Sequence, residues 1–302
     1  MKRWPIVCGG VRRVMLFAYA RAKINLSLDV FEARPDGYHE IASVMQSVSY
    51  SDLLTFEALP EGVCLQATGE PVVGGEDNLV SLAARRLLEA TGCRYGAVIR
   101  LQKNIPVSAG LGGGSADAAA TLIGLNRLWR LGCSMEFLKE LGASLGSDIP
   151  FCLAGGTALV TGRGEATTAL APLPELGVLL LKPAYGVSTA MVYRGWDALR
   201  TRRRPVAREM AAALAEGNWQ EALVNCSNAL EEVVLREHGE LSRLKRVLVE
   251  KGALCALVSG SGPTVYGIFS TLAQAARAGQ LFGSRDLRVI VTTTAREGVL
   301  VG

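Results

Sequence analysis

Apolar and polar residues alternate strictly over residues 21–30, which is the pattern of a half-buried β-strand. The apolar face carries Ala22, Ile24, Leu26, Leu28 and Val30, and the polar face carries Arg21, Lys23, Asn25, Ser27 and Asp29. Two residues of the polar face, Lys23 and Asn25, are ~7 Å apart by the rise of a strand. A turn is predicted over 34–40, and a second strand pair through 43–57.

The next stretch mixes helical and strand patterns. We predict a helix from Asn78 to Gly92 and a strand in 97–106, with Ala97, Ile99 and Leu101 on one face. A helix capped by Ser115 is predicted to run to about Trp129, with a stripe of Ala118, Leu122, Leu125 and Trp129. Another helix covers about 134–145, residues 146–151 break the pattern, and 155–164 reads as a strand and turn.

After Pro172 and Pro174 the pattern starts again. It predicts a strand in 176–184, several helices in 188–251, two strands around a glycine loop in 253–269, a helix in 271–282 and a last strand in 287–295. This order indicates an α+β architecture such as a ferredoxin-like sandwich. We place a domain boundary near residue 170, which gives domains of 1–170 and 171–302.

Composition narrows the class of protein. The chain has 302 residues, of which 49% are hydrophobic and 20% charged, so it can bury a sizeable core. No apolar run approaches the ~18 to 20 residues of a membrane span, and a soluble protein is expected. Seven widely spaced cysteines predict reduced thiols in the cytoplasm, and two histidines make a His-rich metal site improbable.

The excess of positive charge comes from two groups of basic residues. Lys2, Arg3, Arg12 and Arg13 form one cluster; Arg200, Arg202, Arg203 and Arg204 form the other. Without these eight residues the net charge of +4 becomes −4, and no aromatic residues are interleaved with the second cluster. A solvated loop is therefore favoured there over a nucleic-acid site. Residues 1–14 lack a continuous apolar segment, so a secretory signal is not expected. They are interpreted either as a short extension or as the result of a start codon placed too early.

A glycine-rich loop, "GLGGGS" (110–115), carries the clearest candidate chemistry. It has neither the lysine and GK[ST] ending of a Walker loop nor a complete GxGxxG pattern. Glycines nevertheless let backbone N–H groups converge on an anion, and the start of a helix adds unpaired N–H groups. We predict a phosphate-binding loop whose positive charge comes from elsewhere; a flexible connector is the alternative.

Three other segments are individually weak signals. "AKIN" (22–25) places Lys23 on a polar strand face, "GSDIPF" (146–151) places Asp148 in a tight turn, and "SGSGPTVYG" (259–267) is a second glycine loop. Taken singly, Lys23 could be a solvated lysine, Asp148 a turn or helix cap, and the second loop a hairpin. In this order, together with "PVSAGLGGGSADAA", they resemble the GHMP kinase superfamily over almost the whole chain from Met15 onward.

This resemblance implies a fold and a reaction. The fold would be a two-domain GHMP kinase fold, with an N-terminal ribosomal-S5-like domain and a C-terminal ferredoxin-like domain. The reaction would move the γ-phosphoryl group of ATP, accompanied by Mg²⁺, to a hydroxyl of a small molecule. ATP would be bound by residues 106–116, namely Pro106, Val107, Ser108, Ala109, Gly110, Leu111, Gly112, Gly113, Gly114, Ser115 and Ala116. No protein ligand of Mg²⁺ is assigned.

The resemblance also implies roles for single residues. Asp148 would be the general base, and Lys23 its partner, which opposes the charge that develops on the transferred group. The element "DGYHE" is similar to a branch of the superfamily whose substrate carries a cytidine diphosphate, with Tyr38 and His39 reading the base. The remaining substrate contacts would be Asn25, Thr189 and Tyr193, with Asp77 and Asn78 near the adenosine end of ATP. For Asn78 a helix cap is an equally good interpretation.

Other functions stay open at this point. Another small-molecule GHMP kinase, acting on homoserine, a mevalonate or a sugar, is the nearest alternative, and "DGYHE" argues against it. A nucleotide-binding relative without catalysis is disfavoured because both Lys23 and Asp148 are present. An RNA-binding module built on Arg200–Arg204 is disfavoured because the remaining chain is acidic.

Overall fold

The computed structural model describes residues 15–72 and 75–302, so the predicted extension over residues 1–14 lies outside the described residues. In the first part of the chain the strands are β1 (Met15–Ala33), β2 (His39–Leu59), β3 (Val63–Gly69), β4 (Gly96–Lys103), β5 (Thr157–Gly162) and β6 (Ala166–Ala169). The helices there are the 3₁₀ helix η1 (Gly75–Asp77), α1 (Leu79–Thr91), α2 (Gly113–Leu128), α3 (Met135–Ala143) and α4 (Ile149–Ala154).

The second part adds a further sheet and its helices. The strands are β7 (Gly177–Pro183), β8 (Ser227–Asn228), β9 (Cys255–Val258), β10 (Val265–Phe269), β11 (Leu287–Thr293) and β12 (Val299–Val301). The helices are α5 (Thr189–Asp197), α6 (Ala207–Ala215), α7 (Trp219–Val224), α8 (Glu231–Glu237), α9 (Glu240–Glu250) and α10 (Leu272–Gly279). None of the helices in the described residues is both long and apolar enough to cross a membrane.

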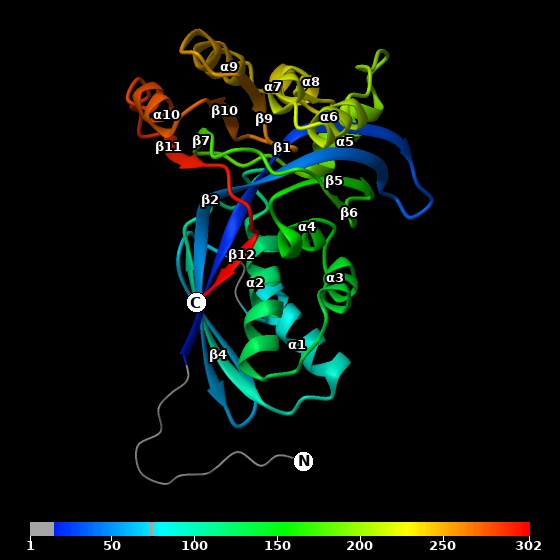
Figure 1. Cartoon of the computed structure of the whole chain (residues 1–302), viewed down its shortest axis with the longest axis vertical. Coiled ribbons are helices and arrows are strands. Elements are labelled where there is room, and N and C mark those ends of the chain that lie inside the picture. Colours follow the sequence, from blue (N-terminus) through cyan, green and yellow to red (C-terminus); the bar gives the residue numbers. More distant parts are fainter. Residues whose placement is uncertain (1–14, 73–74) are drawn as a thin grey trace.

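The first sheet is built around the long β1–β2 hairpin. Its main strand order is β12-β1-β2-β4-β3, with β5 and β6 added beside β2 and the short β8 beside β1. Helices α1 and α2 cover one face of this sheet in the lower half of the molecule (Figure 1). Helix α2 lies so close to β2 that a Cβ on Gly124 would come within 2.5 Å of the Phe56 ring. A glycine inside this helix is therefore a packing requirement.

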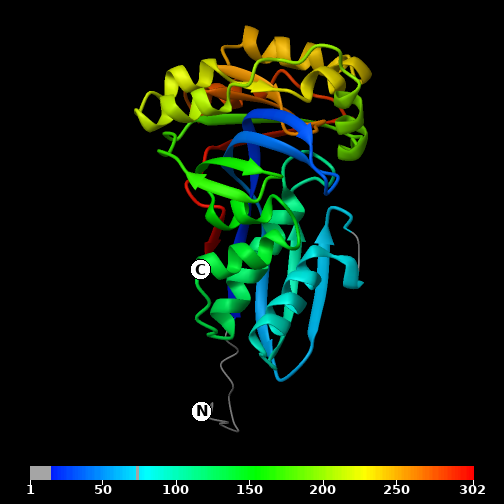
Figure 2. The same cartoon turned by 90° about the vertical axis from the view of Figure 1, so that its right-hand side faces the viewer.

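The second sheet has the order β11-β7-β10-β9, and every pairing in it is antiparallel. This is the strand order of a ferredoxin-like sandwich, as the sequence predicted. Helices α9 and α10 lie over this sheet at the top of the molecule (Figure 1), and the upper part of the β1–β2 hairpin lies beneath it (Figure 2). A buried cluster that includes Ile24, Leu26, Leu180 and Tyr266 joins the hairpin to the second sheet.

The structure corrects three details of the sequence analysis. The polar face of residues 21–30 is buried as well as the apolar face, with Lys23 5% and Asn25 1% exposed, because the two glycine loops lie against these polar side chains while the second sheet packs on the apolar ones. Residues 43–57 form one continuous strand rather than a pair of strands. Helix α2 begins at Gly113 after the left-handed Gly112, so Ser115 lies in its first turn and is not its cap.

The domain boundary near residue 170 remains a prediction. The chain returns to the first sheet twice after this point, through β8 and through β12, which both pair with β1.

The arginines of the basic cluster at 200–204 contact other residues of the chain. Arg202 stacks on the ring of Trp196 at 3.9 Å, and Arg203 and Arg204 pair with Glu231 and Glu209. Three arginines of the basic cluster thus have partners within the chain.

Candidate active site

A cavity of about 1090 Å³ collects the predicted site residues. Its walls come from β1, the tip of the β1–β2 hairpin, both glycine loops, the segment before α4 and the start of α5. Of the residues predicted for catalysis and binding, all but Ala116 line this cavity. Ala116 is fully buried on the inner side of α2 and contributes packing. The fold thus brings together segments that are far apart in the sequence.

Lys23 and Asp148 form an ion pair inside the cavity, with Nζ 3.3 Å from Oδ2. The Lys23 side chain is 7% exposed and the Asp148 side chain 30%, so the carboxylate is the member of the pair that a solute can reach. Asp148 occupies the N-cap position of α4, but its side chain makes no capping hydrogen bond. This geometry argues against the helix-cap alternative, and it leaves the carboxylate directed at the cavity lysine.

A chain of buried hydrogen bonds orients Lys23. Its Nζ donates to Asn25 Oδ1 at 2.9 Å, Asn25 Nδ2 donates to Ser43 Oγ at 2.9 Å, and Ser43 Oγ donates to Ser27 O at 2.5 Å. The β1–β2 register shifts between Arg21 and Lys23 and again between Asn25 and Ser27. Such bulges re-aim side chains next to functional sites. Lys23 and Asn25 themselves are paired in regular register, so they lie on the same side of β1 and the long lysine side chain reaches the Asn25 amide.

The glycine loop folds around the Lys23 side chain. The Lys23 backbone N–H donates to Leu111 O at 3.0 Å, and a Cβ on Gly112 would come within 2.9 Å of Lys23 Cγ. Gly112 also has φ +66°, a left-handed conformation that favours glycine. The first N–H groups of α2 have no acceptor within the helix, and together with the positive end of the helix dipole they can bind an anion. A phosphate held there would lie beside the lysine.

The second glycine loop closes the cavity next to the first. Ser259 Oγ donates to Gly110 O at 2.8 Å, and a Cβ on Gly110 would come within 2.1 Å of Ser259 O. Buried Asn228 donates to Val258 O at 2.9 Å and to Gly260 O at 2.8 Å, and these two hydrogen bonds hold the start of the second glycine loop. The two loops therefore lie directly against each other and form one wall of the cavity.

Aromatic side chains gather at the other end of the cavity. The rings of His39 and Tyr193 lie 5.1 Å apart at 31°, and Arg163 lies over the Tyr38 ring at 5.3 Å. His39 Nε2 is 2.8 Å from Asp197 Oδ1. Burial raises the pKa of Tyr193, and the charge of Asp148 adds to this, so the phenol is neutral and offers a flat surface. Such a group of rings can hold a planar base.

The sequence analysis missed several residues of the cavity wall, among them Lys103, Asp117, Arg163 and Asp197. Lys103 could have been found, because it continues the buried stripe of Ala97, Ile99 and Leu101 where another apolar residue is expected. Arg163 and Asp197 carry no comparable signal, since each lies in a polar stretch whose position depends on the tertiary fold.

Two family models match the chain, "GHMP kinases N terminal domain" over residues 78–156 and "GHMP kinases C terminal" over residues 210–281. Together with the two-sheet fold and the glycine-loop cavity, they define the class of protein as a GHMP kinase. A homoserine kinase from Cytophaga hutchinsonii shares this fold with a TM-score of 0.73 at 20% identity, over 98% of this chain and 99% of that one. The predicted two-domain GHMP kinase fold is thereby confirmed.

More similar relatives narrow the class. A 4-diphosphocytidyl-2-C-methyl-D-erythritol kinase from Pelotomaculum thermopropionicum is 46% identical over 93% of this chain and 98% of its own length. The relative of the same name from Moorella thermoacetica is 44% identical over 91% and 97%. A crystal structure of 4-(cytidine 5'-diphospho)-2C-methyl-D-erythritol kinase superposes with a TM-score of 0.77 at 33% identity, over 92% and 99%. The chain belongs to the 4-diphosphocytidyl-2-C-methyl-D-erythritol kinase family.

Proposed function

We propose that this chain transfers the γ-phosphoryl group of ATP to the 2-hydroxyl of 4-diphosphocytidyl-2-C-methyl-D-erythritol, giving the 2-phosphate and ADP. The reaction is a step of the non-mevalonate pathway to isoprenoid precursors. The observation that carries the proposal is the Lys23–Asp148 pair, which lies in one cavity with a phosphate loop and an aromatic subsite. The relatives named above support the substrate, and ATP is the donor in GHMP kinases.

The geometry supports a direct transfer. Asp148 accepts the proton of the 2-hydroxyl, the freed oxygen bonds to the γ-phosphorus, and the bond from that phosphorus to the bridging oxygen of ADP breaks. Lys23 lies between Asp148 and the glycine loop, where its ammonium opposes the charge on the transferred group. Asn25 holds Lys23 in this position. Phosphoryl transfer needs such alignment and charge stabilisation more than covalent help.

The substrate residues fit the two ends of the cavity. Tyr38, His39 and Tyr193 form a subsite that can hold the cytosine ring by stacking and edge contacts. Thr189 shares a hydrogen bond of 2.8 Å with Ser261, which places it between this subsite and the second glycine loop. Asn78 caps α1 through Val80 N at 2.9 Å and also lines the cavity with Asp77, in support of an adenosine site there.

We propose that Mg²⁺ arrives with ATP and takes most of its ligands from phosphate oxygens and water, as is usual for this ion. Asp148 and Ser115 are oxygen donors of the cavity wall beside the loop. The described residues form no group of three or more His, Cys, Asp or Glu that could hold a metal ion.

We also propose a cytoplasmic location, supported by free thiols at Cys64, Cys93, Cys133, Cys152, Cys226 and Cys255. We propose that the partner is a small molecule rather than nucleic acid or a membrane.

The proposal is tested by measuring ATP consumption with a panel of alcohols. The panel contains 4-diphosphocytidyl-2-C-methyl-D-erythritol, homoserine, mevalonate and galactose. We expect ADP to form with the cytidine compound alone, because the aromatic subsite recognises its base. Turnover with only one of the other three would reject this substrate and favour another small-molecule GHMP kinase.

A further inference from the structure

Three charged residues form a buried cluster beneath the glycine loop, at positions where apolar residues are expected. Asp52 precedes Leu54 and Phe56 on the buried face of β2, Lys103 follows Leu101 on β4, and Asp117 lies among the alanines of α2. Asp52 is 0%, Lys103 3% and Asp117 3% exposed. Burying a charge is expensive unless it is paired, so a cluster of this kind needs a reason.

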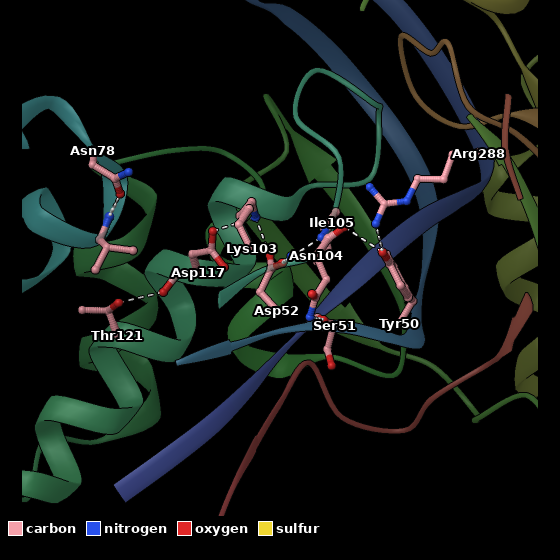
Figure 3. A network of polar contacts seen from close by, with 11 residues as sticks. Tyr50, Ser51, Asp52, Asn78, Lys103, Asn104, Ile105, Asp117, Thr121 and Arg288 are labelled. Atoms are coloured by element: carbon pink, nitrogen blue, oxygen red, sulfur yellow. Dashed lines mark hydrogen bonds and ion pairs between the residues drawn. The ribbon is translucent and has the colours of Figure 1, made fainter. Parts of the chain in front are cut away.

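The pairing joins the two ends of the glycine loop (Figure 3). Lys103 Nζ donates to Asp52 Oδ2 and, at 2.7 Å, to Asp117 Oδ2. Asp52 Oδ1 accepts the backbone N–H groups of Asn104 at 2.5 Å and Ile105 at 2.8 Å, which are the first residues after β4. Asp52 therefore holds the entry of the loop, Asp117 lies on the helix at its exit, and Lys103 bridges them.

The entry of the loop has a second support from the other sheet. Tyr50 Oη donates to Asn104 O at 2.7 Å, and Arg288 of β11 donates to Tyr50 Oη at 2.9 Å. The exit, by contrast, is tied to the entry through Lys103. A Cβ on Gly113, the first residue of α2, would come within 2.8 Å of Lys103 Nζ. The ammonium thus lies directly under the first helical turn, where the phosphate-binding N–H groups are.

We propose that Asp52, Lys103 and Asp117 act as a clamp that sets the width of the glycine loop and so positions its N–H groups for the phosphates of ATP. Lys103 is a positioning residue in this proposal, because the carboxyl groups of Asp52 and Asp117 already bind its ammonium. The cation beside the transferred phosphoryl group is still Lys23. Asp117 Oδ1 is buried without a hydrogen-bond partner among the described residues. Burial, joined by the like charge of Asp52, raises the pKa of Asp117 well above its usual range, which favours a neutral carboxyl and a cluster without net charge.

The proposal rests on ATP as the phosphoryl donor, and nucleotide binding tests it independently of the second substrate. The dissociation constant of ADP, measured by titration calorimetry, is compared for the wild type, Lys103→Met, Asp117→Ala and the double variant. We expect each single change to weaken ADP binding by about 10-fold or more, since a 1 Å misplacement of a binding group can cost about 10²-fold. The double variant should bind no more weakly than the weaker single variant, because either change opens the same clamp.

Kinetics separate positioning from a loss of structure. The KM for ATP should rise, while the KM for the second substrate and kcat at saturating ATP stay near their wild-type values. Arg100→Met is the matched control, because Arg100 lies on the same strand and its exposed side chain points away, toward Glu57. If Lys103→Met does not fold, Asp117→Ala carries the test, since it removes both Asp117 oxygens and keeps Lys103 and its pair with Asp52. Unchanged ADP affinity in Asp117→Ala, or a rise in both KM values together with an equal fall in kcat, would overturn the proposal.

Discussion

The ammonium of Lys23 lies 3.3 Å from the carboxylate of Asp148, although one residue comes from the first strand and the other precedes α4. Neighbouring residues hold both side chains in place, because Asn25 and Ser43 orient the lysine and the start of α4 fixes the aspartate. A glycine loop that lacks its own lysine thus obtains one from a distant strand.

Removal of either member of this pair should lower turnover. We expect Lys23→Ala and Asp148→Asn each to reduce kcat by ~10² or more, because one removes charge stabilisation and the other removes the base. Steady-state kinetics at saturating ATP and second substrate measure this loss. Lys139→Ala, on α3 away from the cavity, is the control. Near-normal kcat in either variant would refute the assigned role.

Gly112 should be required for more than its backbone conformation. In Gly112→Ala the new Cβ would come within 2.9 Å of Lys23 Cγ, so we expect kcat/KM to fall by about 10²-fold through displacement of the lysine. Gly132→Ala is the matched control, because Gly132 has a similar φ of +71° but no neighbour within 4 Å of its Cβ position. Both variants should lose about 1–2 kcal/mol of stability. Equal activity of the two variants would contradict the prediction.

The aromatic subsite should affect the second substrate alone. Tyr193→Leu removes a ring that lies 5.1 Å from His39, and base stacking on an aromatic ring contributes about 1–3 kcal/mol. We expect the KM for the cytidine substrate to rise about tenfold while the KM for ATP stays unchanged. Tyr95→Leu, at an exposed position directly before β4, serves as control. A rise in the KM for ATP alone would show that Tyr193 contacts the nucleotide donor and would contradict the prediction.

Asp117 should make stability depend on pH. Burial raises its pKa above the unfolded value of ~3.9. A carboxyl with a raised pKa contributes its full stability below the unfolded pKa and loses it as the pH rises toward the folded pKa. The charged groups that face it are Lys103 on β4 and Asp52 on β2. The free energy of unfolding of the wild type, relative to Asp117→Asn, should therefore fall as the pH is raised from about 4. Urea denaturation over a pH series measures this difference, and a constant difference would contradict the prediction.

Periodicity predicted most of the elements because local pattern determines them. The alternation in 21–30 and the helix from Asn78 to Gly92 are examples: Asn78 caps α1 through Val80, and Gly92 ends it in a left-handed conformation. The burial of both faces of β1 could not be predicted, because it depends on loops and on a second sheet far along the chain. The pairing of β12 with β1 could not be predicted either, because the two strands lie at opposite ends of the sequence.

The candidate site shows the same division. The glycine loop could be predicted from the sequence because all of its residues are contiguous. The meeting of Lys23, Asp148 and Tyr193 was expected from the resemblance to GHMP kinases and not from spacing. The clamp under the loop could be predicted in part. Asp52, Lys103 and Asp117 are charged residues at positions where the sequence pattern predicts buried apolar ones, and pattern analysis can find such positions. Which of them pair with one another depends on the tertiary fold.

The most direct test of the central claim is the position of the new phosphate on the product. The ³¹P NMR spectrum is recorded after wild-type enzyme has been incubated with ATP, Mg²⁺ and 4-diphosphocytidyl-2-C-methyl-D-erythritol. The account predicts ADP and one new phosphomonoester on the 2-oxygen, with the diphosphate of the substrate intact. ATP hydrolysis without a new monoester, or a phosphate on another hydroxyl, would contradict it.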